Sequence, residues 1–294
     1  MRGRLQRTLC ACGAAGLLLG AVVTVHARPQ TQTQTQTQEP APTPAGLANS
    51  QYAHLLDSRP DSGQTVAPVF EGWAPNADGT VSMYFGYMNR NWKEELDISI
   101  GPNNNFAPGP PDRGQPTHFL PRRHKQIFAV VVPKGYKDTI VWTLAIRGRS
   151  EKVPGSLKPE QQIDVSIDTS DNNTPPKISV PARMTAVVGQ PLRMSAAVTD
   201  DGLPKARATQ STSPLAGLNV RWSKYRGPGP ITFTTVVTPV TRGTATTEAT
   251  FTQPGVYTVQ ALADDGSVLA TSQGQNVPGF ACCWSTANIT VTVN

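Results

Sequence analysis

Short segments in which every second residue is hydrophobic, each closed by a Gly, Pro or Asp-Gly turn, constrain the fold of this chain most strongly. A period of two places the hydrophobic side chains on one face of a β-strand. The predicted strands cover 81–87, 96–100, 127–132, 140–146, 163–167, 178–180, 192–198, 218–222, 249–251, 257–263 and 289–293. Short strands separated by turns predict an all-β chain built from immunoglobulin-like β-sandwiches.

Two of these segments carry sharper expectations. The run from Ile127 to Val132 is continuously apolar and is closed by Pro133, which predicts a strand buried on both faces. Trp222 stands within an alternating segment and is the expected buried aromatic residue between two sheets.

The first 27 residues have the three parts of a secretory signal peptide. Arg2, Arg4 and Arg7 form a basic region, residues 9–25 are apolar, and Val25-His26-Ala27 resembles a cleavage site. The apolar run is too short and too rich in Gly and Ala for a membrane span. We therefore expect an exported protein, in the periplasm, in the cell envelope or outside the cell, with an uncleaved anchor as the alternative.

The predicted organisation is a signal peptide (1–27), a low-complexity linker (28–65) and two β-sandwich modules (66–168 and 174–294). The linker contains a Thr-Gln repeat and then a Pro-rich stretch, which bury too little apolar area to fold. Within it, residues 52–56 could form a short helix. Thr174-Pro175-Pro176 marks the junction between the modules, because consecutive prolines favour an extended connection.

The charge of the chain argues against a nucleic-acid partner. Its formal net charge is +6, and the leader contributes three basic residues and no acidic one, which leaves about +3. Nucleic-acid binding needs a clustered basic face. The one local cluster, Arg122 to Lys125, is read as a solvated strand, with a weak polyanion contact as the alternative.

The segment Asn103–Phe119 is a long polar stretch between predicted strands, and long loops are often functional. Six of its side chains could form a surface that recognises carbohydrate: Asn103, Asn104, Asn105, Arg113, Gln115 and His118. The alternative is a loop that covers an open sheet edge. The aromatic residues Trp73, Tyr84, Tyr87 and Trp92 could add a sugar-stacking face, or they pack in the core.

Motifs for catalysis are absent from the sequence: there is no HExxH, GxSxG or phosphate-binding Gly loop. A Ser/His/Asp triad is spatial rather than sequential, so His118 is the first residue to suspect. We predict no enzyme, no cofactor and no metal site. Asp200-Asp201 and Asp264-Asp265 could meet at one end of a sandwich, but calcium needs six to eight oxygen ligands, and solvated turn acids are the simpler interpretation.

After the leader only two cysteines remain, and Cys282 and Cys283 are adjacent. Neighbouring Cα atoms lie ~3.8 Å apart, whereas an ordinary disulfide prefers ~4.4–6.8 Å. The favoured interpretation is a vicinal disulfide that stiffens a loop. Free thiols, an intermolecular bridge and a soft-metal contact stay open.

Two resemblances accompany these patterns. In the first module, Phe70–Trp73, Phe85–Asn91, Gly114–Phe119 and Trp142–Leu144 resemble a segment of uncharacterised exported proteins from environmental bacteria. The resemblance implies an exported setting and no particular activity.

The second module carries the other resemblance. Val220–Gly229, Ile231–Phe233 and Ala249–Gly266 resemble the polycystic-kidney-disease (PKD) type of immunoglobulin-like domain, whereas the stretches 203–217 and 272–287 depart from it. That family implies a β-sandwich for extracellular adhesion or spacing. The chain is therefore expected to be a secreted, non-catalytic binding or adhesion protein, with a glycan or an envelope protein as its partner. A structural spacer of an envelope assembly is the alternative, and a secreted hydrolase is the third hypothesis.

Overall fold

The computed structural model describes residues 59–165, 172–203, 217–266 and 283–294. These residues are all-β, apart from one 3-10 turn, η1 (Pro159–Gln161). No helix long and apolar enough to cross a membrane occurs among them. The strands belong to one unit, Asp57–Asn294. The predicted signal peptide and the helix at 52–56 lie outside the described residues.

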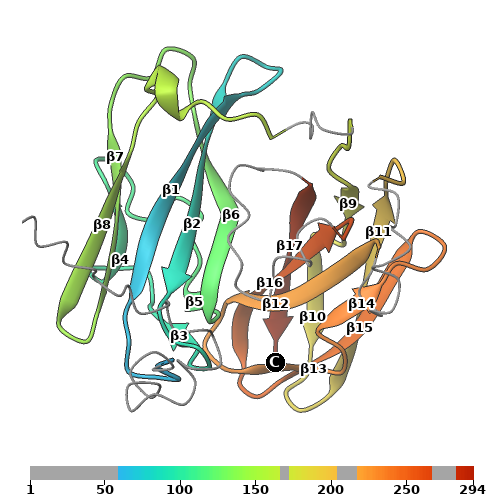
Figure 1. The fold of residues 1–294 in the computed structure, drawn as a ribbon. Helices are drawn as coiled ribbons and strands as arrows, with labels where there is room; N and C mark the ends of the chain where they lie inside the picture. The colour runs from blue at the N-terminus through green and yellow to red at the C-terminus, as the bar shows by residue number, and fades with distance from the viewer. Residues whose placement is uncertain (1–58, 166–171, 204–216, 267–282) are drawn as a thin grey trace, which may run out of the picture. The chain divides into compact units, whose positions relative to one another are not determined.

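Eight strands form what we call the N-terminal sandwich (Figure 1): β1 (Val66–Pro75), β2 (Val81–Asn89), β3 (Leu96–Asp97), β4 (Asn104–Ala107), β5 (His118–Phe119), β6 (Arg122–Val132), β7 (Ile140–Ile146) and β8 (Arg149–Gly155). They are arranged as two three-stranded sheets, β1-β2-β6 and β4-β7-β8, and a short pair, β3-β5. All of these pairings are antiparallel.

Aromatic rings fill the space between the two three-stranded sheets. Phe85 of β2 meets Phe106 of β4 edge to face at 5.2 Å between ring centroids, and Phe128 of β6 meets Trp142 of β7 at 5.1 Å. Phe85 and Trp142 are fully buried. Edge-to-face pairs contribute beyond the area that they bury, so this cluster fixes how the sheets pack.

Three expectations for this region were wrong. β6 is not buried on both faces: Val130 and Val132 point into the core, whereas Val131 is 60% exposed, because only one face of the β1-β2-β6 sheet covers the aromatic cluster. The segment Asn103–Phe119 is not a loop throughout, because it contains β4, which pairs with β7, and β5. The predicted strand at 163–167 does not form over its described residues, 163–165, where Ile163 donates one backbone hydrogen bond to Trp73 O. Residues 166–167 lie outside the described residues.

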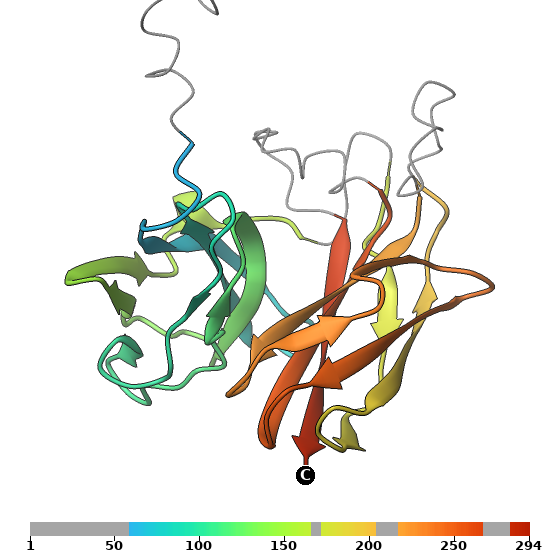
Figure 2. The same ribbon diagram turned by 90° about the horizontal axis from the view of Figure 1, so that it is seen from below.

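The described residues from 172 onward contribute nine strands to the C-terminal sandwich: β9 (Lys177–Ser179), β10 (Arg183–Ala186), β11 (Pro191–Thr199), β12 (Asn219–Arg226), β13 (Ile231–Phe233), β14 (Val237–Pro239), β15 (Thr244–Phe251), β16 (Gly255–Asp264) and β17 (Trp284–Val293). One sheet has the order β10-β17-β16-β12-β14 and the other β13-β15-β11-β9 (Figure 2). β9 is antiparallel to β11, whereas β10 is parallel to the last strand, β17. The first two strands of the sandwich, β9 and β10, thus belong to different sheets.

Two buried aromatic residues mark the C-terminal sandwich as immunoglobulin-like. Trp222 of β12 is 1% exposed, which confirms the expectation, and its Nε1 donates to Thr238 Oγ1 at 2.9 Å. Tyr257, near the start of β16, donates its hydroxyl to the carbonyl oxygen of Gln253 at 2.9 Å. A buried Trp on the third main strand and a Tyr that bonds back to the preceding corner are hallmarks of this fold.

Candidate functional site

The two most buried residues of the predicted recognition surface hold its backbone together. Asn104 is fully buried, and its Nδ2 donates to the carbonyl oxygens of Ile98 (2.9 Å) and Pro116 (2.8 Å). Its Oδ1 accepts a hydrogen bond from Trp142 Nε1 at 3.0 Å. Because buried polar groups need partners, Asn104 is an internal brace between the segment and the core.

Gln115 plays the same part further along the segment. It is also fully buried, with Nε2 donating to Pro111 O and Oε1 accepting from Arg113 N, both at 2.8 Å. Asn104 and Gln115 therefore direct their polar atoms inward and present little to a ligand.

The other members of the predicted surface lie further out. Asn103 is exposed, and Asn105 is partly buried with Nδ2 donating to Gly101 O and Pro102 O. Arg113 is partly buried and donates to Pro108 O at 2.7 Å. A recognition role for Asn103, Asn105 and Arg113 stays a prediction.

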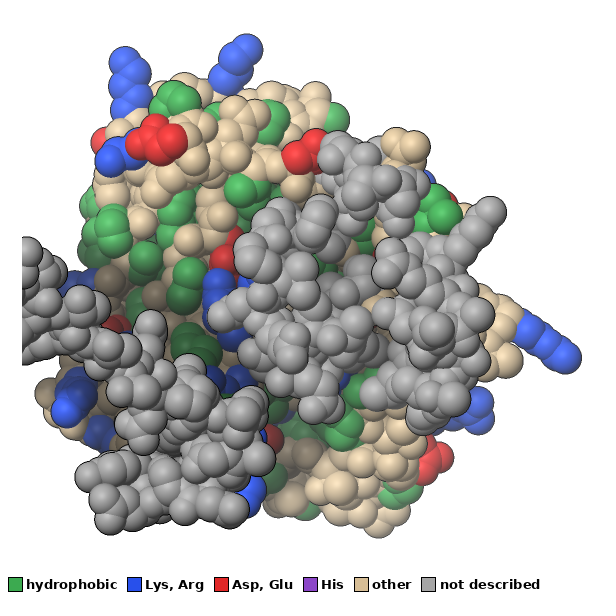
Figure 3. Space-filling model, viewed as in Figure 1, with side chains coloured by type: hydrophobic (Ala, Val, Ile, Leu, Met, Phe, Trp, Pro, Cys, Tyr) green, Lys and Arg blue, Asp and Glu red, His purple; other side chains and the backbone are tan. Residues whose placement is uncertain are grey.

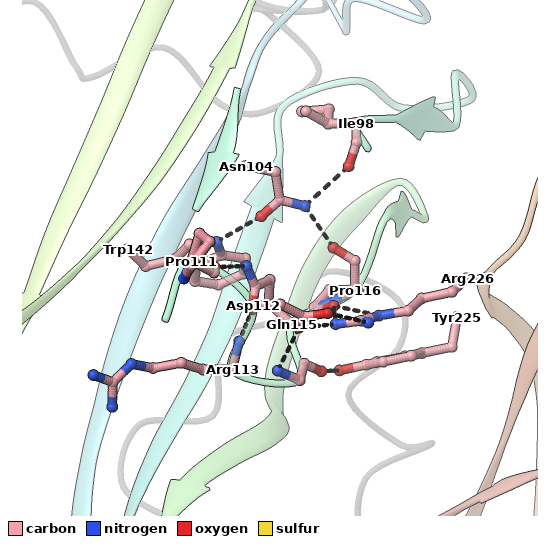
Figure 4. A network of polar contacts seen from close by, with 11 residues as sticks. Ile98, Asn104, Pro111, Asp112, Arg113, Gln115, Pro116, Trp142, Tyr225 and Arg226 are labelled. Atoms are coloured by element: carbon pink, nitrogen blue, oxygen red, sulfur yellow. Dashed lines mark hydrogen bonds and ion pairs between the residues drawn. The ribbon is translucent and has the colours of Figure 1, made fainter. Parts of the chain in front are cut away.

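The same segment is bonded to β12 of the C-terminal sandwich, as Figure 4 shows. Arg226 donates to both carboxylate oxygens of Asp112, at 2.9 and 2.8 Å, and to Gln115 O from Nε at 2.8 Å. Tyr225 donates its hydroxyl to Gly114 O. A backbone bond from Thr117 N to Tyr225 O at 3.1 Å completes the contact. We call this contact, together with the one described next, the junction.

A second part of the junction centres on His118 of β5. Its Nδ1 lies 3.0 Å from Asp97 Oδ1, and its Nε2 lies 3.0 Å from Glu95 Oε2. Lys224 of β12 forms an ion pair with the same Asp97 oxygen at 2.9 Å. Asp97 stands opposite His118 in the β3-β5 register, so the strand pairing brings these groups together.

The pKa values of this cluster follow from its contacts. Burial opposes the charged form of His118, but the hydrogen bonds to Asp97 and Glu95 outweigh it and raise the pKa of His118. Burial likewise opposes the charge of Asp97, and hydrogen bonds from His118 and Lys224 lower its pKa overall. The hydrogen bond from His118 lowers the pKa of Glu95. The four residues thus share two positive and two negative charges when His118 is protonated.

Neither histidine of the described residues has the setting of a catalytic base. A base in a triad uses one nitrogen for its orienting carboxylate and the other for the nucleophile. Both nitrogens of His118 contact carboxylates. His124 stacks on Tyr87 and bonds to Pro121 O, and burial, with the charges of Arg221 and Arg123, lowers its pKa to about 4. His54 lies outside the described residues.

One of the two acidic pairs is better buried than expected for solvated turn residues, whereas Asp200 is partly buried and Asp201 is exposed. Asp264 and Asp265 are 1% and 4% exposed, and Asp265 accepts a hydrogen bond from Asn173 at 2.7 Å. Burial raises the pKa of Asp200, and the charges of Asp201 and Asp265 add to the effect, so the two pairs do approach each other. Among the described residues no group of His, Cys, Asp or Glu has the arrangement of a metal site.

Cys283 is fully buried and disulfide-bonded. All other cysteines of the chain lie outside the described residues, so the vicinal pair with Cys282 stays a prediction.

The predicted basic cluster does not form a free cationic patch. Arg123 forms a bidentate ion pair with Glu71 at 2.6 and 2.8 Å. The guanidinium groups of Arg122 and Arg59 lie over the ring of Trp92, at 4.2 and 4.9 Å from its centroid. The ring of this candidate sugar-stacking residue is therefore already in contact with two cationic side chains. On the face shown in Figure 3, Lys and Arg side chains are dispersed rather than gathered.

Sequence reasoning missed the partners that β12 supplies to the junction. Lys224 and Arg226 flank Tyr225 in the stretch that resembles PKD-type domains. Strict alternation would place Lys224 and Arg226 on the same face as the buried Trp222, and the register shift between Lys224 and Arg226 interrupts it, so strand periodicity gave no signal for these contacts. Nothing local in the sequence pairs them with Asp97 and Asp112, which precede them by more than 100 residues.

No protein-family model matches the chain, and no curated protein matches it. Among solved structures, the D00-D0 domain of intimin is similar at 11% identity and a TM-score of 0.27, with 78% of this chain and 100% of that one covered. Domains 4 and 5 of the S-layer protein SbsC are similar at 11% identity and a TM-score of 0.23, with 56% of this chain and 69% of that one covered. The titin immunoglobulin tandem A164-A165 is similar at 11% identity and a TM-score of 0.20, with 79% of this chain and 99% of that one covered. Scores this low transfer no function, and the immunoglobulin-like assignment rests on strand order, Trp222 and Tyr257.

Proposed function

We propose that this chain is an exported, non-catalytic binding or adhesion protein that acts at the cell envelope or outside the cell. The observation that carries the proposal is the junction, in which Asp112, Gly114 and Gln115 of the N-terminal sandwich bond to Tyr225 and Arg226 of the C-terminal one. Bidentate Arg–carboxylate contacts fix orientation as well as distance. Two sandwiches fixed in this way present a constant surface to a partner.

Other features support the non-catalytic part of the proposal. The contacts of His118 with two carboxylates leave neither of its nitrogens for a nucleophile. The leader-like first 27 residues support export. The strand order and the pair Trp222 and Tyr257 support a PKD-type origin for the C-terminal sandwich. A glycan or an envelope protein is the proposed partner.

The test is saturable binding of the purified protein to envelope fractions and to a polysaccharide panel. We expect binding that falls when Asn103 and Arg113 are replaced together by Ala, because these side chains are the outward members of the predicted surface. The matched control is Lys152→Ala, an exposed residue on β8. Turnover of a glycan, ester or peptide substrate that disappears with His118→Ala would contradict the proposal.

A structural spacer is the second candidate, and one observation favours it. The side-chain amides of Asn104 and Gln115, two fully buried polar residues of the segment, bond only within the N-terminal sandwich. A folded protein that binds none of the probes would shift the assignment to this spacer role.

A further inference from the structure

A small cavity lies at the junction, between Arg221, Ser223 and Lys224 of β12 and residues of the N-terminal sandwich that include Tyr87 and His124. Its volume is about 30 Å³. One buried water needs about 10–15 Å³, whereas pockets for organic ligands measure about 300–1,000 Å³. The cavity therefore has room for a water-sized species and excludes a sugar or a peptide.

The lining of this cavity is cationic. Arg221 and Lys224 both contribute to it, and none of the described residues that line it is Asp or Glu. Lys224 is 8% exposed and has its own counter-ion, Asp97, at 2.9 Å. The charge of Lys224 is thus already neutralised by Asp97, which does not itself line the cavity.

Arg221 is the other cation, and it lacks such a partner. Among the described residues its guanidinium makes no side-chain hydrogen bond or ion pair, although Asp264 acts on it through space. Burial lowers the pKa of Arg221, yet a guanidinium stays protonated in proteins. A partly buried charge with unused donors is unfavourable unless something accepts from it.

The other described residues that line the cavity add donors and no carboxylate. His124 is neutral at physiological pH, because its pKa lies near 4. The hydroxyl of Tyr87 accepts from Leu120 N at 2.9 Å, which leaves its proton to donate, and Ser223 adds a second hydroxyl. A convergent set of donors around a guanidinium that forms no ion pair among the described residues is the chemistry that selects an anion.

We propose that the junction cavity binds one small monovalent anion, of the size of chloride, against the guanidinium of Arg221. The anion would accept hydrogen bonds from Arg221 and from the hydroxyls of Ser223 and Tyr87. Because its ligands come from both sandwiches, it would also strengthen the junction. The cavity adjoins the predicted recognition surface, because His118 belongs to both, but the anion site does not depend on the proposed function.

The test is ³⁵Cl NMR of the purified protein, in which exchange of chloride with a protein site broadens the resonance. We expect saturable broadening that bromide reverses and that the larger sulfate does not. Arg221→Gln should weaken chloride binding by about tenfold or more, because hydrogen bonds to charged groups contribute about 1.5–3 kcal/mol. Arg221→Lys, which keeps the charge, should retain part of the binding.

Arg193→Gln is the matched control, since Arg193 is exposed on β11 in the other sheet, and it should bind chloride as the unmodified protein does. Acetate that displaces chloride as well as bromide does would extend the site to carboxylates. Absence of saturable broadening, undiminished broadening in a folded Arg221→Gln protein, or equal displacement by sulfate would overturn the proposal.

Discussion

The two sandwiches differ in the length of their strands and in the side chains that pack between their sheets. The C-terminal sandwich uses long strands, such as β16 and β17, which pair over ten positions, and a core rich in Ala and Val. The N-terminal sandwich has smaller sheets and fills the space between them with Phe85, Phe106, Phe128 and Trp142. It also buries amide side chains, among them Asn89 with four side-chain hydrogen bonds and Asn104 with three.

This difference teaches where each sandwich is most sensitive to substitution. Long regular ladders spread stability over many backbone bonds and many small side chains. A core of a few large rings and buried amides concentrates stability in single residues, because each removal leaves a large cavity or several unpaired polar groups.

Trp142→Ala should destabilise the protein by about 3–5 kcal/mol, the usual range for removal of a buried large aromatic side chain. Trp142 also contacts the rings of Phe85, Phe106 and Phe128, whereas Trp222 has no aromatic ring partner in the described part of the chain. Urea unfolding should therefore show a larger loss for Trp142→Ala than for Trp222→Ala. Equal losses would remove the contrast between the two cores.

Asn104→Leu should cost about 3 kcal/mol, because it leaves Ile98 O, Pro116 O and Trp142 Nε1 without their partner. The comparison is Asn105→Leu, the neighbouring, partly buried amide, which should cost about 1 kcal/mol or less. The free energy of unfolding from denaturant titration decides between them. Similar costs for the two variants would show that burial of the amide is unimportant.

The junction should contribute less than either core. A double-mutant cycle of Asp112→Asn and Arg226→Gln should give a coupling energy of about 0.5–1 kcal/mol, because the Asp112 side chain is 47% exposed and solvent screens the pair. The coupling should shrink as salt is added. A coupling near zero at low salt would mean that the two sandwiches are held by other contacts.

The smallest effect should be a dependence on pH around His118. Because the folded protein raises its pKa above 6.5, the stability from His118 is fully present below pH 6.5 and is lost as the pH rises through the folded value. Lowered pKa values of Glu95 and Asp97 act in the opposite sense, with stability lost as the pH falls below their ordinary values of 4.5 and 3.8.

His118→Gln should therefore flatten the profile of unfolding free energy between pH 6 and 8 (about one unit on either side of neutrality). His124→Gln is the contrasting variant: because folding lowers the pKa of His124 from 6.5 to about 4, this residue loses stability as the pH falls below 6.5, so its replacement should change the slope in the opposite sense. An unchanged slope in the His118 variant would exclude the cluster as the source of the pH dependence.

The contrast between the sandwiches also explains what the sequence could predict. Residues 192–198 and 257–263 alternate because long strands have one buried face, and β11 and β16 appear where they were expected. β4 was missed because it begins with two Asn residues, of which Asn104 is buried by hydrogen bonds rather than by apolarity. β1 and β8 were missed because Pro, Glu and Gly interrupt their patterns.

The candidate site was harder to predict than the fold. The sequence singled out His118 and the segment around it but gave no sign that Asp97 and Lys224 would meet it. Contacts over such separations depend on how two sheets dock, and strand periodicity carries no information about docking. The assignment of Trp222 succeeded because burial within a single sandwich is readable from one strand.

The parallel pairing of β10 with β17 has a mechanical consequence. The register runs from Arg183 opposite Thr290 to Ala186 opposite Val293, so the start of β10 and the end of β17 lie at opposite ends of one ladder. A force that pulls the two ends of the C-terminal sandwich apart therefore slides these strands past each other, and the hydrogen bonds between them share the load instead of opening one after another. Under tension along the chain, the C-terminal sandwich should therefore open at a higher force than a module whose terminal strands separate one hydrogen bond at a time.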